Sequence, residues 1–188
     1  MKTMVLFYPG CIEFEVMLAA EILNGKYPVE VKTPDGTDHT GSNGMVFKSS
    51  GAIESIDPRS YKVGLIPGGD PGVLIGNSGL NKKLVEMHSQ GAALGAICAG
   101  PVVLEQAGLL KGKRIAHGYK GPQLQFLNEK GFFKETVLTD ESVITENQIV
   151  TARPDSFIDF AIEIARIADV IPEDRVGFWK RYYHGNPK

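Results

Sequence analysis

The sequence predicts an α/β fold in which a mostly parallel sheet is covered by helices on both faces. Apolar runs of strand length recur along the chain, and segments with apolar residues at helical spacing separate them. This alternation is typical of βαβ units, whose crossovers place helices on both faces of the sheet. With 188 residues and 43% hydrophobic residues, the chain predicts one domain, residues 1–188, that forms a core without disulfide bonds.

The first third of the chain predicts a strand, a helix and two further strands. Residues 4–8 form an apolar run that a proline and a glycine end, and residues 14–25 repeat apolar positions at helical spacing up to a glycine. Residues 28–33 alternate as a strand does, and residues 61–66 are the next apolar run. Between these strands, residues 35–51 are rich in Gly, Ser, Thr and Asn, which predicts a hairpin or an excursion at the sheet edge.

The middle of the chain continues the alternation. Residues 78–89 predict a helix, and residues 92–97 are a strand of small apolar residues that leads directly into a helix over residues 102–108. Residues 114–117 then predict a short strand, and residues 123–129 predict a helix that a glycine ends.

The last part of the chain predicts two β-runs within residues 137–151 and a long amphipathic helix over residues 156–169. The segment from residue 173 to 188 is aromatic and slightly basic. For this segment we expect a packed cap, a partner surface or a frayed tail.

Composition and charge exclude several classes of function. A net charge of −2 with no long run of Lys or Arg argues against a nucleic-acid partner. The uncharged stretch at residues 91–104 is shorter than the ~20 apolar residues of a membrane-spanning helix. The first ten residues lack a cleavage site, and two cysteines are too few for a disulfide framework, so we expect a cytoplasmic location. No spacing typical of a zinc or dinucleotide site is present, and we expect no metal and no cofactor.

The most informative joint is the passage from strand to helix at Cys98. Residues 96–100 read AICAG, a run of small residues around a nucleophile, as a sharp strand-to-helix turn requires. We expect the backbone N–H groups at the start of the next helix to stabilise the thiolate and lower the pKa of Cys98 from ~8.5. The alternative is that Cys98 is a small hydrophobic residue buried at the end of a strand.

The motif AICAGP at residues 96–101, together with IPGGDPG at residues 66–72, resembles the DJ-1/PfpI superfamily, and its DJ-1 branch in particular. The resemblance extends over nearly the whole chain, through FYPGCIEFE at residues 7–15, AHG at residues 116–118 and VTARPDSFIDFAIEIA at residues 150–165. It implies a flavodoxin-like sandwich related to class I glutamine amidotransferases, a homodimer, and a reactive cysteine at the strand-to-helix turn.

The resemblance also assigns the candidate site residues. It implies that Cys98 is the nucleophile, Glu15 the acidic residue that contacts it, and His117 the histidine beside it, with the N–H groups of Gly69 and Ala99 forming an oxyanion hole. All of them follow predicted strands, whose carboxyl ends hold ligands in open α/β sheets. A carboxylate beside a thiolate raises both pKa values, so we predict that Glu15 is protonated and donates a hydrogen bond to sulfur.

Several of these residues also have simpler interpretations. Glu15 on its own suits a solvated position near a helix N-terminus, and Glu13 is its rival, although it would point the other way in an extended loop. His117 is either a general acid or base or a structural residue. Cys11 is either a resolving thiol for Cys98 or a buried small side chain.

The first functional hypothesis, which the resemblance implies, is a cofactor-free enzyme that acts on small reactive carbonyls, glyoxalase- or deglycase-like, such as the conversion of methylglyoxal to lactate. The second is a redox sensor or stress-protective protein in which Cys98 is oxidised to a sulfinate that Glu15 stabilises. The third is hydrolase or amidotransferase-like work on an amide. The PfpI protease branch carries a histidine directly after the nucleophile, where this chain has Ala99, which argues against a peptidase.

Overall fold

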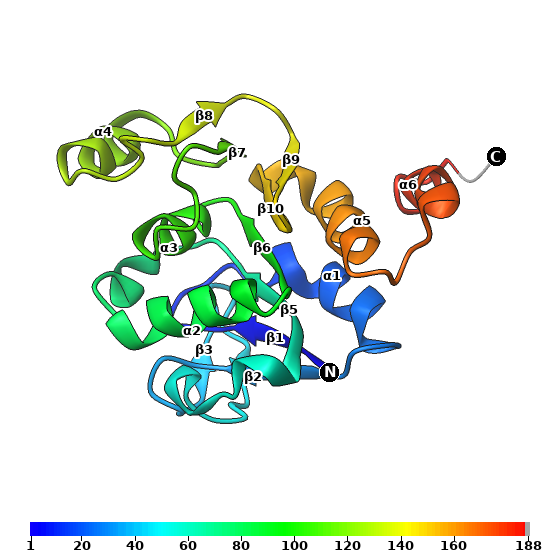
Figure 1. The fold of residues 1–188 in the computed structure, drawn as a ribbon, viewed down its shortest axis with the longest axis horizontal. Coiled ribbons are helices and arrows are strands. Elements are labelled where there is room, and N and C mark those ends of the chain that lie inside the picture. Colours follow the sequence, from blue (N-terminus) through cyan, green and yellow to red (C-terminus); the bar gives the residue numbers. More distant parts are fainter. Residues whose placement is uncertain (187–188) are drawn as a thin grey trace.

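The computed structural model describes residues 1–186 and is built on a six-stranded central sheet (Figure 1). All neighbouring strands of this sheet are parallel except the last pair, which is antiparallel. This arrangement confirms the predicted, mostly parallel sheet. The strands lie in the order β2 (Val29–Lys32), β1 (Lys2–Leu6), β5 (Tyr61–Ile66), β6 (Ala93–Ile97), β10 (Ile149–Ala152) and β9 (Val143–Glu146).

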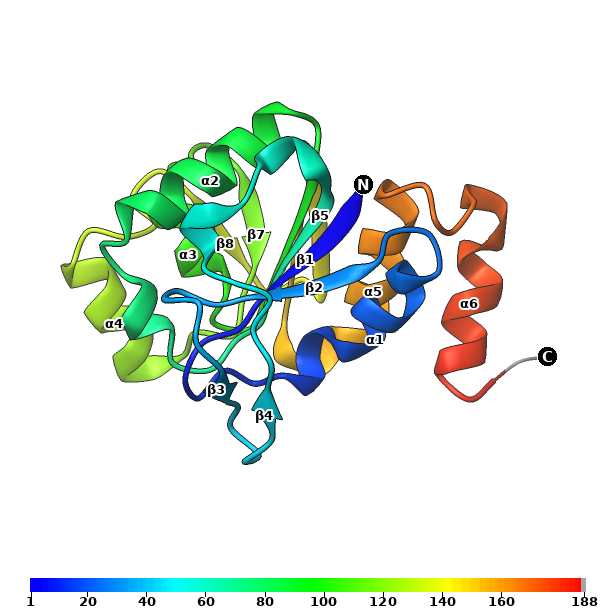
Figure 2. The ribbon, with the colours of Figure 1, turned by 90° about the horizontal axis from the view of Figure 1, so that it is seen from below.

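Helices cover both faces of the sheet and complete the three layers of a flavodoxin-like sandwich (Figure 2). On one face, α1 (Phe14–Asn24) packs against α5 (Phe157–Ile167), and α6 (Val176–Tyr183) packs on α5 from outside. On the other face lie α2 (Ser78–Ser89) and α3 (Pro101–Gln106), which contact each other.

The C-terminal segment is a packed cap, because side chains of α6 contact the hydrophobic core. These side chains are Val176, Trp179 and Tyr183. The last two residues of the segment, 187 and 188, lie outside the described residues.

Four short strands lie outside the central sheet. β3 (His39–Thr40) and β4 (Val46–Phe47) form an antiparallel hairpin that projects from the body of the molecule (Figure 2), as the polar segment predicted. β7 (Arg114–Ala116) and β8 (Val137–Thr139) pair with each other in parallel. The region predicted to contain two β-runs therefore holds three strands, β8, β9 and β10, which contribute to two different sheets.

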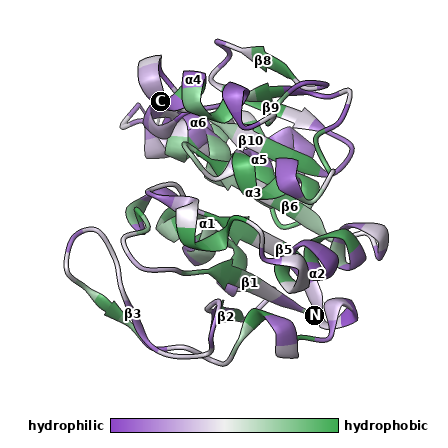
Figure 3. Ribbon diagram, turned by 90° about the vertical axis from the view of Figure 1, so that its left-hand side faces the viewer, coloured by the Kyte–Doolittle hydropathy of each residue, from purple (hydrophilic) through white to green (hydrophobic). Residues whose placement is uncertain are grey.

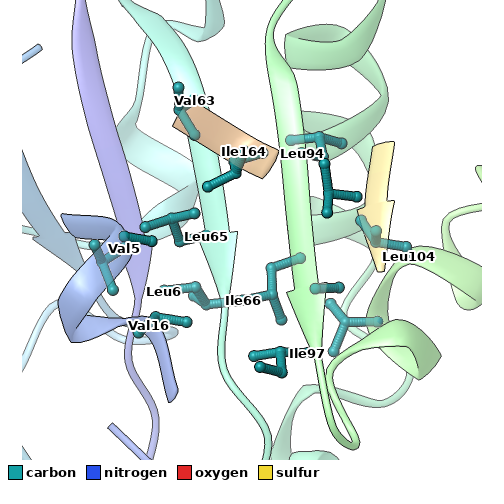
Figure 4. Close-up of a cluster of buried hydrophobic side chains, with 14 of the residues drawn as sticks. Val5, Leu6, Val16, Val63, Leu65, Ile66, Leu94, Ile97, Leu104 and Ile164 are labelled. Atoms are coloured by element: carbon teal, nitrogen blue, oxygen red, sulfur yellow. The ribbon is translucent and has the colours of Figure 1, made fainter. Parts of the chain in front are cut away.

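The core lies along the central strands, whose residues are buried on both faces of the sheet (Figure 4). In β5, for example, Leu65 and Ile66 are adjacent in sequence and both fully buried. Burial on both faces explains why these strands read as continuous apolar runs. Hydrophobic residues are concentrated in the same strands and in α3 (Figure 3).

The strand order places a topological switch point between β1 and β5. From β1 the chain crosses to β2 on one side and later returns to β5 on the other. In open α/β sheets the loops at such a point diverge, and ligands bind in the crevice outside the carboxyl ends of the strands. The segments that follow β1, β5 and β6 at this edge carry Glu15, Gly69, Cys98 and Ala99, whereas His117 follows β7.

Candidate active site

Cys98 lies directly after β6 in a strained turn. Its backbone is left-handed, with φ of 62°, a conformation that is uncommon for residues other than glycine. The turn is held by the Cys98 N–H, which donates to the Ala152 carbonyl (2.9 Å), and by the Cys98 carbonyl, which accepts from the Gly118 N–H (2.8 Å). The helix α3 begins three residues later. The Cys98 side chain is half-buried, in contrast to the fully buried strand that precedes it.

Glu15 reaches Cys98 from the first turn of α1. Its side chain is 1% exposed, its carboxyl group forms a hydrogen bond with the Cys98 thiol, and its Oε2 accepts from the Gly68 N–H at 2.7 Å. Its rival, Glu13, is also buried but accepts from the N–H of Ser42 at 3.1 Å. Glu15 is therefore the acid that faces the sulfur, and it is not a solvated residue at a helix N-terminus.

Gly69 and Ala99 both direct backbone N–H groups at the Cys98 sulfur. Gly69 has φ of 110°, and a Cβ at this position would lie 2.6 Å from the carbonyl oxygen of Gly10. Only glycine fits this position without displacing the loop that follows β1. The two donors come from different loops, so they converge on the sulfur only in the folded chain.

Gly68 is a site residue to which the sequence analysis gave no role. A Cβ on Gly68 would lie 2.6 Å from the Cys98 Cβ and 2.7 Å from Oε2 of Glu15. Its own carbonyl accepts from the hydroxyl of Tyr8 at 2.6 Å. Gly68 thus leaves the space in which the carboxyl group and the thiol meet. The paired glycines of the IPGGDPG motif are the signal for it.

The protonation of the pair differs from the prediction. Burial raises the pKa of Glu15, in the direction predicted. Burial and the negative charge of Glu15 raise the pKa of Cys98 to about 12, although the N–H groups of Ala99 and Gly69 act in the opposite direction. The predicted lowering by the helix N-terminus is therefore outweighed when Glu15 is ionised. Two groups so close titrate as a pair, and a proton that the pair shares is held more tightly than either group alone would hold it.

His117 lies near the turn, but its ring contacts other groups. Its Nδ1 accepts from the Tyr119 N–H at 3.1 Å, and the two rings stack with centroids 5.4 Å apart. Burial lowers the pKa of His117. Within residues 1–186, no hydrogen bond joins its ring to Cys98 or Glu15. The expectation that His117 follows a strand of the same sheet is wrong, because β7 pairs with β8 in a separate sheet.

Tyr119 is a second residue that the sequence analysis did not identify. Its buried hydroxyl donates to the Ala99 carbonyl at 2.6 Å and accepts from the Val102 N–H at 2.7 Å. Both partners belong to the start of the helical segment that follows Cys98. Tyr119 therefore fixes the orientation of the segment that follows Cys98, and no sequence pattern predicts this role.

Cys11 does not pair with Cys98, because both cysteines are free. Its side chain is fully buried, and burial raises the pKa of Cys11 to about 11. Its backbone N–H donates to the Tyr8 carbonyl and its carbonyl accepts from the Ser42 N–H. These contacts favour the interpretation of Cys11 as a buried small side chain.

Residues 1–186 contain no group of three or more His, Cys, Asp or Glu side chains that could hold a metal ion. Among the same residues, no helix combines the length and the apolar character needed to cross a membrane.

Comparison with known proteins places these features in context. The model of the DJ-1/PfpI family matches residues 1–167. Protein DJ-1alpha of Drosophila melanogaster is 31% identical over 170 residues, which cover 87% of this chain and 75% of the relative. A deglycase of Pyrococcus abyssi is 34% identical over 79 residues, 40% of this chain and 46% of the relative. The crystal structure of Drosophila melanogaster DJ-1beta matches with a TM-score of 0.76 and 22% identity, covering 97% of each chain, a likeness of fold.

Proposed function

The chain belongs to the DJ-1/PfpI family, and we propose that it is a cysteine-dependent enzyme that converts small reactive carbonyl compounds without a cofactor. The observation that carries this proposal is the pair of buried Glu15 and half-buried Cys98, with the N–H groups of Gly69 and Ala99 directed at the sulfur. The name of the Pyrococcus abyssi relative, a deglycase, supports a carbonyl substrate. We take methylglyoxal as the model substrate and lactate as its product.

The first step forms a bond between the sulfur and the aldehyde carbon. As the Cys98 sulfur attacks, its proton passes to the carboxylate of Glu15, which is already hydrogen-bonded to the thiol. The carbonyl oxygen becomes an oxyanion, and the N–H groups of Gly69 and Ala99 stabilise it. Glu15 then returns the proton to this oxygen, which gives a neutral hemithioacetal and a free carboxylate.

The second step moves a proton between two adjacent carbons. The Glu15 carboxylate removes the proton from the former aldehyde carbon and passes it to the ketone oxygen, which gives a neutral enediol. Glu15 then takes the proton from the former aldehyde oxygen and delivers it to the former ketone carbon, which gives the lactate thioester of Cys98. Water then hydrolyses the thioester and restores the thiol, so that the aldehyde carbon is oxidised, the ketone carbon is reduced, and no external oxidant is needed. Because Nδ1 of His117 accepts from the Tyr119 N–H, the neutral ring carries its proton on Nε2, and we assign this N–H to holding the water that the Glu15 carboxylate deprotonates.

The experiment that tests this function measures lactate formation from methylglyoxal. We expect Cys98→Ser to lower kcat/KM by about 1,000-fold or more, as loss of a nucleophile does in other enzymes. Cys11→Ser is the matched control and should retain turnover. If wild type and Cys98→Ser form lactate at equal rates, the proposed mechanism is wrong.

Oxidation of Cys98 defines a second candidate function. Cys98 is half-buried while Cys11 is fully buried, so an oxidant reaches Cys98 first. The N–H groups of Gly69 and Ala99 and a protonated Glu15 are suited to hold the oxygens of a sulfinate. A redox sensor would gain a binding or protective activity on oxidation, whereas an enzyme would lose turnover.

We further propose that residues 1–188 form one domain that acts as a homodimer in the cytoplasm. The two free thiols suit a reducing compartment. The apolar side chains of Phe14, Met45 and Val46 are all more than half exposed, and a second copy of the chain would cover them. Light scattering during size-exclusion chromatography is expected to give twice the 20.4 kDa of the chain. A mass of one chain at micromolar concentration would contradict the dimer.

A further inference from the structure

A cavity of about 150 Å³ lies beside the turn that carries Cys98. It lies between the loop that follows β5, the start of α3, and α4 (Gly121–Glu129), which stands on the outer side of α3 (Figures 1 and 2). The mechanism above does not use this cavity. Its lining residues are Asp70, Pro71, Gly72, Ile75, Val102, Tyr119, Gln123, Phe126 and Leu127.

The wall of the cavity contains Tyr119 and residues that lie close in sequence to the candidate active site. Asp70 directly follows Gly69, one of the two N–H donors to the sulfur. Tyr119 directly follows Gly118, where an added Cβ would lie 3.1 Å from the Cys98 sulfur. Val102 lies four residues beyond Cys98. The segments at Gly69 and Gly118, which contact Cys98, therefore reach the cavity wall at their next residue. The chain of Cys98 itself reaches the wall four residues later, at Val102.

The wall of the cavity is mostly apolar. The side chains of Pro71, Val102 and Leu127 are buried in it, and those of Ile75 and Phe126 are 41% and 56% exposed. The only buried polar group in the lining, the hydroxyl of Tyr119, already makes two hydrogen bonds to the backbone. An apolar wall of this kind takes an apolar group, and a cavity of ~150 Å³ is large enough for a benzene molecule.

The polar residues of the lining limit the choice of ligand. Asp70 and Gln123 are both exposed, so they lie where the cavity opens to solvent. The carboxylate of Asp70 accepts from the Gly72 N–H at 3.0 Å and repels a second negative charge. A neutral apolar group therefore suits the cavity better than a carboxylate or a phosphate.

We propose that compounds which react at Cys98 carry a neutral apolar group, the size of a phenyl ring or a branched alkyl chain, and that this group lies in the cavity between Ile75, Val102 and Phe126. For the carbonyl itself the inference rests on the proposed function, and it names the substrate class as 2-oxoaldehydes with such a substituent. Methylglyoxal, whose substituent is one methyl group, would leave most of the cavity empty.

The first test measures reaction at Cys98 without turnover. The probes are iodoacetamide and N-phenyliodoacetamide, with the modified peptide quantified by mass spectrometry and glutathione as the reference thiol. The ratio of the alkylation rate with N-phenyliodoacetamide to the rate with iodoacetamide is expected to be about 10-fold higher for Cys98 than for glutathione. Burial of one apolar ring permits a gain of this size. Ile75→Trp fills the mouth of the cavity and should abolish this gain. Val73→Trp is the matched control, because Val73 is exposed on the same loop and does not line the cavity.

The second test compares kcat/KM for phenylglyoxal and methylglyoxal, with Cys98→Ser as the background. We expect wild type to prefer phenylglyoxal, Ile75→Trp to lose this preference, and Val73→Trp to keep it. If the phenyl reagent is preferred in alkylation but neither aldehyde is turned over, the cavity binds an apolar group as proposed. The assignment of carbonyl compounds as substrates is then refuted. Equal ratios in the protein and in glutathione, or equal effects of the two tryptophan variants, would overturn the inference.

Discussion

Cys11 and Cys98 both follow a central strand at the same edge of the sheet. They differ in their exposure to solvent and in the hydrogen bonds of their thiols. The pKa of each thiol is raised by burial, to about 11 for Cys11 and about 12 for Cys98. Cys11 is fully buried, whereas Cys98 is half-buried. The pKa values therefore do not show which of the two cysteines is the nucleophile. Solvent access and hydrogen bonding distinguish them instead.

Each cysteine has an acidic neighbour, and the comparison extends to these acids. The charge of Glu13 raises the pKa of Cys11, but the carboxylate of Glu13 is bound to Ser42. The carboxyl group of Glu15 forms a hydrogen bond with the Cys98 thiol itself. Direct contact allows a proton to move between the two groups, and this contact distinguishes the catalytic pair.

Among substitutions of the two acidic neighbours, we expect Glu15→Gln to cause the larger loss of activity. The amide cannot accept the proton of the thiol, so we expect kcat for lactate formation to fall by about 100-fold or more, the usual contribution of a general base. Glu13→Gln is the matched control and should keep turnover within about threefold, because it removes no proton acceptor from Cys98. Steady-state kinetics with methylglyoxal measure both variants. Equal losses in the two variants would contradict the assignment of Glu15 as the base.

The second effect concerns the space at Gly68. Gly68→Ala places a Cβ 2.6 Å from the Cys98 Cβ, so the thiol and the carboxyl group must move apart. A displacement of about 1 Å costs about 100-fold in rate, and we expect a loss of that size in kcat/KM. Gly25→Ala is the control, because Gly25 has helical φ and no atom within 4 Å of the added Cβ. An active Gly68→Ala enzyme would show that the close approach is not required.

The third prediction uses oxidation to separate the two thiols. A small excess of hydrogen peroxide should convert Cys98 to a sulfinate and abolish turnover while Cys11 stays reduced, because oxidation follows exposure. Peptide mass spectrometry and activity are measured on the same samples. Oxidation of Cys11 at the same rate would refute the difference in access. Retained turnover with fully oxidised Cys98 would favour the redox sensor over the enzyme.

The smallest effect is on the pH dependence of stability. Because burial raises the pKa of Glu15, the folded state binds its proton more tightly than the unfolded chain does. This contribution is complete below the unfolded pKa of ~4.3 and is lost as pH rises through the folded pKa. We expect the Tm of the wild type to fall over this window relative to that of Glu15→Gln, because the wild type alone loses this contribution. Parallel curves for the two proteins would show that the fold does not retain this proton.

Much of the fold follows from local pattern, as a comparison of the central strands β5 and β6 with the separate pair β7 and β8 shows. The apolar runs that became β5 and β6 were predicted within a residue, because strands buried on both faces leave an unbroken signal. The pairing of β7 with β8 joins Arg114 to Val137 and leaves no local signal, so His117 was assigned to the wrong sheet. Short strands of this kind are defined by contacts distant in sequence.

The candidate site also has features that the sequence predicts and features that it does not predict. Cys98 was identifiable because the residues around a strand-to-helix turn must be small. The role of Gly68 was not, since it depends on the loop after β5, α1 and the turn meeting at one point. The direction of the pKa shift of Cys98 also failed to follow from the helix N-terminus, because burial and Glu15 act more strongly than two backbone N–H groups.

The measurement that tests the central claim most directly is the pH dependence of Cys98 alkylation by iodoacetamide in wild type and Glu15→Gln. A pair that shares one proton gives the wild type two rises, one at acidic pH to a plateau and another as the pH approaches 12, the raised pKa of Cys98. Glu15→Gln should show a single rise at a pH below 12, because the charge that raises the pKa of Cys98 is gone. Superimposable curves with one rise near the ~8.5 of a free thiol would contradict the account, because Cys98 would then be an ordinary cysteine.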